Sequence, residues 1–117
     1  METLEILKSL ADLNRLRILK ILLTFKEACN CDLEEVLKLN QSNTSRHIIK
    51  LRKDDLIICK KKGKWSYYSL NLELLKKNSF IMDILESLDD CIFLEDKNSF
   101  IEFLKIKNHC SDKKINT

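Results

Sequence analysis

Apolar residues recur three and four positions apart through the first half of the chain, which predicts amphipathic helices joined by short connections. We expect four of them, over residues 4–10, 13–24, 31–38 and 43–54. Asp12 is a good N-cap for the second helix, and Ser42 is a good N-cap for the fourth. The third and fourth helices are joined by a tight turn at 39–41, and the fourth is polar and basic on its outer face. This is the pattern of a helix-turn-helix motif.

The hydrophobic period changes from helical to alternating after the fourth helix. Residues 56–59 predict one strand and 65–70 a second, and the only glycine, Gly63, lies between them where a hairpin turn needs a positive φ. Two further apolar helices are expected over 72–88 and 93–106. The predicted fold class is therefore mainly α with a β-hairpin, a winged helix-turn-helix of order α-α-α-α-β-β-α plus a C-terminal helix.

The length and composition fit one small domain. We place it at residues 1–106 of the 117, and we expect the polar segment 107–117 to be a flexible tail. One glycine and no proline disfavour turn-dense β architectures. The start of the chain lacks the regions of a signal peptide, and no apolar run approaches the ~20 residues of a membrane span. We therefore expect a cytoplasmic protein with no membrane contact.

Positive charge is concentrated in one segment of the chain. Residues 42–68 carry eight basic and two acidic side chains, although the formal net charge of the whole chain is only +3. The remainder of the chain is therefore net negative. A single basic face on an otherwise acidic protein is typical of contact with a polyanion such as DNA.

We expect double-stranded DNA to be contacted by the start of the fourth helix and by the tip of the hairpin. Arg46 can donate to guanine or to phosphate, and hydroxyl and amide groups suit phosphate contacts. His47 suits a phosphate or water contact as well as it suits base reading. A lysine run is a solvated face in most proteins, but beside a basic helix it favours a phosphate or minor-groove contact. The candidate DNA-binding residues are Gln41, Ser42, Ser45, Arg46, His47, Lys50, Lys61, Lys62 and Lys64.

Five cysteines, an odd number in a chain without an export signal, favour reduced thiols or a soft-ligand site over a disulfide framework. Cys29 and Cys31 would diverge by about 200° on a regular helix. They converge only if Cys29 lies outside the helix, for instance with Asn30 as N-cap and Cys31 in the first turn. Two thiolates with no nearby histidine suit a low-coordination soft ion such as As(III) better than four-coordinate zinc. The alternative is that both are small, partly buried residues at a helix start.

Four local strings, in this order, resemble the ArsR/SmtB family of metal-responsive winged-helix repressors. They are LADLNRLRIL at 10–19, EACNCDL at 27–33, QSNTSRH at 41–47 and KGKWSYY at 62–68. The resemblance covers roughly residues 4–90, and the Cys-Asn-Cys-Asp-Leu segment is most similar to the arsenite-responsive branch. That branch often has a third cysteine three residues after the second, where this chain has Glu34. The family's zinc site uses Asp and His ligands on the C-terminal helix, and residues 72–100 contain no histidine.

The resemblance implies a homodimeric repressor, not an enzyme. It would bind operator DNA, control arsenic-resistance genes, and be released by As(III), or by Sb(III), at Cys29 and Cys31. The tail around Cys110 is also similar to tails in that branch, so Cys110 is the candidate third ligand. The alternatives are a thiol redox switch or a sensor of another thiophilic ion. A thiol oxidoreductase would need a Cys-x-x-Cys motif and a βαβ pattern, and this sequence has neither. We expect the dimer interface near 4–10 and 72–88, whose apolar stripes exceed what a monomer can bury.

Overall fold

The computed structural model describes the backbone of residues 2–115 and the side chains of residues 2–106. The elements in chain order are α1 (Glu2–Leu10), α2 (Leu13–Phe25), β1 (Ala28–Cys29), α3 (Asn30–Leu37), α4 (Gln41–Lys53), β2 (Ile57–Lys62), β3 (Trp65–Leu70), α5 (Leu72–Lys77), α6 (Ser79–Glu86) and α7 (Cys91–Ile115). The expected tail at 107–117, with the side chain of Cys110, lies outside the described side chains.

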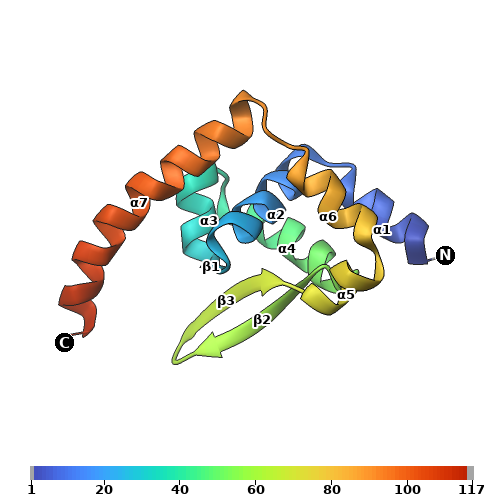
Figure 1. The fold of residues 1–117 in the computed structure, drawn as a ribbon. Helices are drawn as coiled ribbons and strands as arrows, with labels where there is room; N and C mark the ends of the chain where they lie inside the picture. Colours follow the sequence, from blue (N-terminus) through green and yellow to red (C-terminus); the bar gives the residue numbers. More distant parts are fainter. Residues whose placement is uncertain (1, 116–117) are drawn as a thin grey trace.

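The α2 helix is the centre of the molecule, and the other elements pack around it (Figure 1). Its buried residues are Ile18, Leu19, Ile21 and Leu22. These side chains point in several directions from the axis, so α2 contacts helices and strands on most of its sides. The order of helices and hairpin confirms the predicted winged helix-turn-helix. Within the described part of the chain, no helix combines the length and apolarity that a membrane crossing requires.

Side-chain caps set where α2 and α4 begin. Asp12 caps α2 as predicted, because its carboxylate accepts the Arg15 N–H at 3.0 Å. The α4 helix begins earlier than predicted. Its N-cap is Asn40 rather than Ser42, since Asn40 Oδ1 accepts the Asn43 N–H at 2.8 Å. Asparagine is as good a cap as serine, and the sequence offers both within three positions.

The helix predicted over 72–88 is divided into α5 and α6 at Asn78. This residue has φ −129° and ψ 73°, outside the helical region. Its side-chain amide donates to the Leu74 carbonyl at 3.1 Å. Such a local bond competes with continuation of the helix, which is why asparagine is unfavourable in helix interiors.

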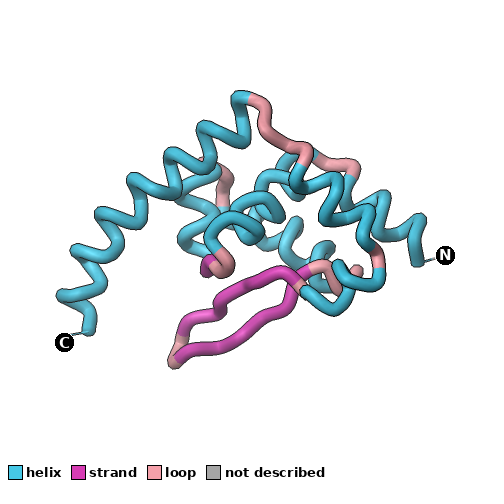
Figure 2. Tube along the Cα trace, viewed as in Figure 1, coloured by secondary structure: helices cyan, strands magenta, loops and turns pink. Residues whose placement is uncertain are grey.

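A third strand joins the predicted hairpin. The β1 strand pairs antiparallel with β3, with Ala28 opposite Tyr68 and Cys29 opposite Tyr67, so the sheet order is β1-β3-β2. The strands are the magenta segments of Figure 2. Gly63 forms the hairpin turn with φ 63°, as predicted. Two residues are too few to show an alternating pattern, so β1 could not be predicted from the sequence.

Three residues other than glycine have a positive φ among the described residues. They are Lys26 (76°) after α2, Lys38 (57°) after α3 and Asp55 (60°) after α4. Lys38, with ψ 43°, is in the left-handed helical region, which costs a residue with a Cβ roughly 1–2 kcal/mol, whereas Lys26, with ψ −44°, is outside it. These helix ends therefore carry local strain that glycine would have avoided.

One buried ion pair holds α7 across α2 and α3 (Figure 1). The Nε and Nη2 of Arg17 lie 2.9 and 3.0 Å from the two carboxylate oxygens of Asp96. The same guanidinium donates to the Leu37 carbonyl, at the end of α3, at 3.0 Å. Nearby, the rings of Phe25 and Phe100 stack with centroids 4.3 Å apart. The ion pair therefore fixes three helices relative to one another.

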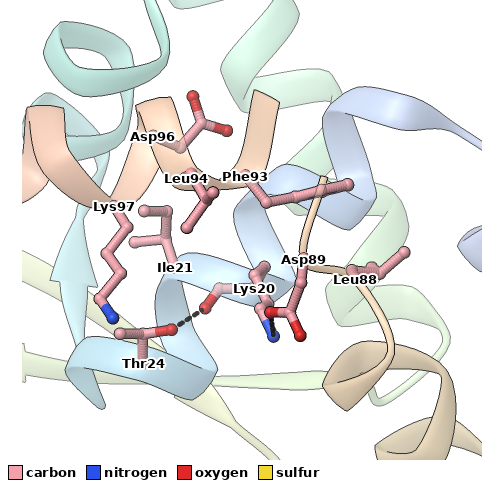
Figure 3. Close-up of a pocket in the computed structure, with 9 residues that line it drawn as sticks. All are labelled: Lys20, Ile21, Thr24, Leu88, Asp89, Phe93, Leu94, Asp96 and Lys97. Atoms are coloured by element: carbon pink, nitrogen blue, oxygen red, sulfur yellow. Dashed lines mark hydrogen bonds and ion pairs between the residues drawn. The ribbon is translucent and has the colours of Figure 1, made fainter. Parts of the chain in front are cut away.

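A small cavity of 110 Å³ lies beside this ion pair, between α2 and the start of α7 (Figure 3). Lys20 Nζ donates to the Leu85 carbonyl at 2.8 Å and lies 3.8 Å from Asp89 Oδ1. Thr24 Oγ1 donates to the Lys20 carbonyl at 2.9 Å. Ligand pockets are usually larger than about 300 Å³. We therefore interpret this cavity as a packing joint.

We predict that Asp96→Ala lowers the free energy of unfolding by about 3 kcal/mol, because it leaves the Arg17 guanidinium buried without its carboxylate. Equilibrium urea unfolding measures this value. The control is Glu102→Ala, which breaks the exposed pair with Lys105 on the same helix and should change stability by less than about 1 kcal/mol. Equal effects of the two variants would contradict a structural role for the buried pair.

Candidate nucleic-acid interface and cysteine site

The α4 helix has one buried and one exposed side. Its buried residues are Thr44, His47, Ile48 and Leu51. Gln41, Ser42 and Arg46 are exposed on the opposite side, and Ser45 is half-buried at its edge. Arg46 donates to Asn43 Oδ1 at 3.1 Å, which holds the guanidinium along the helix surface. Four of the predicted DNA-binding residues therefore lie together on the first turns of α4, at or beside its exposed side.

His47 lies inside the protein, and its prediction as a DNA contact is corrected. Its side chain is 5% exposed, and Nδ1 lies 3.4 Å from Arg15 Nη1 and 4.0 Å from Asp12 Oδ1. Burial lowers the pKa of His47 below its ordinary 6.5; Asp12 raises it, whereas Arg15 and Arg46 lower it. The imidazole is therefore neutral at pH 7 and packs α4 against the start of α2.

Lys50 is half-buried and pairs with carboxylates of the protein itself. Its Nζ lies 3.0 Å from Asp54 Oδ2 and 3.8 Å from Glu5 Oε2. The Ser9 hydroxyl donates to the same Asp54 carboxylate. Lys50 therefore connects α4 to α1, and its DNA contact stays a prediction, because its ammonium group has two carboxylate partners while its side chain is still 31% exposed.

The hairpin lysines are exposed, but their surroundings differ. Lys62 Nζ lies 2.8 Å from Glu27 Oε1 and 5.0 Å from the centre of the Tyr67 ring. Lys64 Nζ lies 5.7 Å from the centre of the Trp65 ring. Lys61 has no carboxylate within salt-bridge distance among the described residues. The hairpin tip thus presents Lys61 and Lys64 to solvent, while Lys62 is partly neutralised.

Cys29 and Cys31 lie at the start of α3, on the two sides of its N-terminal boundary. Cys29 is the N-cap and is buried at 6% exposure, whereas Cys31 is exposed in the first turn. The N-cap expected at Asn30 is therefore displaced by one residue. Asp32 explains the shift: its buried carboxylate accepts the Cys29 N–H at 3.0 Å and completes a capping box. An acidic residue three positions after the cap is the sequence signal that could have located this boundary.

Both cysteines line the same cavity of 290 Å³, together with residues of the hairpin. The hairpin residues that line it are Lys64, Trp65, Ser66 and Tyr68. The structure thus places the two cysteines together at one site, with Cys29 outside the helix as the convergence argument requires. It also places this site against the wing, which the sequence did not indicate.

Two contacts join the cysteine segment to the elements that carry the basic residues. Asn30 Nδ2 lies 3.5 Å from Ser45 Oγ on α4. On the other side, Cys29 is paired with Tyr67 of β3. A displacement of the start of α3 would therefore alter contacts with both α4 and the hairpin.

The described side chains contain no third ligand for a metal ion at this site. Within residues 2–106, no three His, Cys, Asp or Glu side chains are grouped as a metal site would require. Cys59, on β2, is half-buried, and Cys91 is exposed at the start of α7. Cys110, the predicted third ligand, is outside the described side chains.

The arrangement of α3 and α4, followed by a lysine-bearing hairpin against the same core helix, defines a winged helix-turn-helix protein. Residues 12–58 match the family described as bacterial regulatory protein, arsR family. The chain is 38% identical over 84 residues to the arsenical resistance operon repressor of Staphylococcus xylosus, covering 72% of this chain and 80% of that one. The chain belongs to the ArsR family, as the sequence resemblance indicated.

Further relatives agree with this assignment. The arsenical resistance operon repressor of Bacillus subtilis is 44% identical over 66 residues, which are 56% of this chain and 63% of that protein. This chain therefore spans less than two thirds of that relative. The crystal structure of the transcriptional repressor PagR of Bacillus anthracis superimposes with a TM-score of 0.63 at 30% identity, over 75% of this chain and 93% of that one.

We predict that the lowered pKa of His47 makes the protein less stable in mild acid. The unfolded chain binds the proton more readily than the native state, so the free energy of unfolding falls as pH decreases below about 6.5. His47→Gln should reduce this loss between about pH 7.5 and pH 5.5, measured by chemical unfolding at both pH values. His109→Gln, at the only other histidine, is the control and should keep the wild-type pH dependence. A pH dependence in His47→Gln as large as that of the wild type would contradict the assignment.

Proposed function

We propose that the protein is a dimeric transcriptional repressor that binds operator DNA in the cytoplasm and releases it when As(III) binds at Cys29 and Cys31. The observation that carries this proposal is the position of the cysteine pair: the two cysteines line a cavity with residues of the wing, and Asn30 between them contacts Ser45 of α4. Membership of the ArsR family and similarity to arsenical resistance operon repressors support it.

The proposed DNA contact uses the exposed face of α4 and the tip of the wing. The α4 helix packs against β2, and the two lie on the same side of α2 (Figure 1). The hydroxyls of Ser42 and Ser45 are suited to phosphate, and Arg46 can reach guanine edges from the first turns of the helix. Lys61 and Lys64 add charge at the wing tip. Helix and wing would therefore read bases and bind the backbone, respectively.

The proposed dimer is supported by apolar side chains that the monomer leaves exposed. On α1, Leu4 and Leu7 are 46% and 44% exposed, and on α5 Leu72 is 61% exposed. Fewer residues of 72–88 are available for an interface than the sequence indicated, because Leu75, Ile81 and other apolar residues of α5 and α6 are buried in the monomer. The interface would therefore use α1 together with the start of α5.

The proposed inducer site needs two thiols that can turn toward one ion. On binding arsenite, As(OH)3, each thiol replaces one hydroxyl: an As–S bond forms, an As–O bond breaks, and the thiol proton leaves with the hydroxyl as water, with arsenic remaining As(III); Sb(III) shares this chemistry. Cys29 would have to leave its capping position to do so, which weakens the start of α3. The ion must favour the DNA-free form by the full coupling free energy, typically ~1–3 kcal/mol. A third ligand would come from Cys110 or from a small-molecule thiol.

We predict that the helix and the wing contribute differently to DNA affinity. Arg46→Ala should weaken binding to an operator more than binding to random DNA. Lys61→Ala should weaken both equally and reduce the slope of log affinity against log salt by about 2 per dimer, one for each wing. Lys62→Ala is the matched control and should reduce the slope less, because Glu27 already pairs with that lysine. Fluorescence anisotropy over a salt series measures all three, and identical profiles would refute the division.

We predict that Cys29→Ser and Cys31→Ser keep operator affinity but lose release by arsenite, because one sulfur cannot chelate the ion. Anisotropy of the bound operator during an arsenite titration, in the presence of reductant, measures release. Cys91→Ser is the control and should respond as wild type. A weakened response of Cys110→Ser would identify the third ligand. Continued release in both cysteine variants would refute the site, and release by peroxide alone would favour a redox switch.

A further inference from the structure

Ile49 is an exposed aliphatic residue in the middle of α4. Its side chain is 66% exposed, whereas the other aliphatic residues of the helix, Ile48 and Leu51, are 2% and 0% exposed. Nothing in the packing of the monomer accounts for a branched apolar side chain at this position, where a polar residue would avoid contact between apolar surface and water.

The position of Ile49 on the helix places it at the centre of the exposed face. At about 100° per residue, it lies within about 60° of Ser42, Ser45, Arg46 and Lys53. The buried side, with Thr44, His47, Ile48 and Leu51, is opposite. Ile49 is therefore surrounded by Ser42, Ser45 and Arg46, which are proposed to contact DNA, and by the cationic side chain of Lys53.

The major groove of DNA offers one apolar group to such a side chain. The C5-methyl of thymine projects into this groove, whereas unmodified cytosine, guanine and adenine present only donors, acceptors and ring edges there. We propose that Ile49 packs against the methyl group of a thymine and is a specificity-determining residue that selects a T·A pair at that position. This inference rests on the proposed DNA-binding function and names the group in DNA that α4 recognises.

The geometry also limits the alternatives. The contacts that hold α4 to α1 and α2 use His47 and Lys50, which lie on the other side of the helix from Ser45. Ile49 is therefore not part of the packing of α4 on those helices. The remaining alternative is that Ile49 contacts a second protein chain, and the experiment distinguishes this alternative through the oligomeric state.

The test removes the methyl group from DNA and the side chain from the protein, separately and together. The wild-type protein selects a duplex from a random pool, and each thymine of that duplex is then replaced in turn by deoxyuridine, which lacks only the methyl group. Wild type and Ile49→Ala are titrated with each duplex by anisotropy. Ile106→Ala is the matched control, because this isoleucine is 65% exposed on α7, far from α4 in the chain.

We expect each half-site to contain one thymine whose single replacement by deoxyuridine weakens wild-type binding about fourfold. This is the equivalent of about 0.8 kcal/mol for one buried methyl group. Ile49→Ala should bind the thymine and deoxyuridine duplexes equally, and Ile106→Ala should behave as wild type. Because Ile49 is exposed, its replacement should leave the thermal midpoint of unfolding unchanged.

Three results would overturn the inference. They are a selected site in which no thymine responds, an Ile49→Ala protein that still distinguishes thymine from deoxyuridine, and a change of oligomeric state in Ile49→Ala that accounts for its weaker binding. The proposed function fails separately, when the pool yields no preferred sequence. That result would remove this inference as well.

Discussion

The position of the candidate site depends on the charge of Arg17, which can be buried only where its partners meet. The guanidinium is held by the Asp96 carboxylate on α7 and by the Leu37 carbonyl at the end of α3. An unpaired buried charge is strongly unfavourable, so α3 and α7 cannot slide along α2 by a small amount without losing the pair. The C-terminal end of α3 is therefore fixed. Its N-terminal end, which carries the cysteines, is held by the short strand β1 and by the contact of Asn30 with Ser45. The C-terminal end of α3 thus depends on a charged group, whereas its N-terminal end depends on neutral backbone pairing and on the capping box of Cys29 and Asp32.

The α4 helix likewise has two sides with different surroundings. Its buried side docks on α1 and α2 through groups that need specific partners, such as the His47 imidazole beside Asp12 and Arg15. Its exposed side makes few contacts within the protein and can therefore contact a ligand. A movement at the start of α3 would reach α4 at Ser45, on the border between these sides. The wing would receive the same movement through β1, so the two proposed DNA contacts would change together.

Hydrophobic spacing predicted most of the fold because the apolar stripes of this chain are long and regular. The first four helices and the hairpin follow from it, and the single Gly63 located the turn. What failed were features decided by one polar side chain. Asn78 interrupts a stripe that continues across it, and Asn40 competes with Ser42 as a cap. For the site, the residue type of His47 suggested DNA although its phase, four positions before Leu51, places it on the apolar side. The ion pairs of Lys50 were not foreseen because Glu5 is distant in sequence and Asp54 lies one turn later.

The helix ends at Lys26 and Lys38 bracket the segment that contains β1, both cysteines and α3. Both residues are exposed, and each has a positive φ at a cost on the order of 1–3 kcal/mol while its backbone N–H donates to a carbonyl of the preceding helix turn. When the segment loosens, this strain is relieved at both junctions, and the relief offsets part of the contacts that are lost. Opening this segment would therefore cost less than its contacts alone indicate, and a ligand that opens it would need to supply only the remaining free energy.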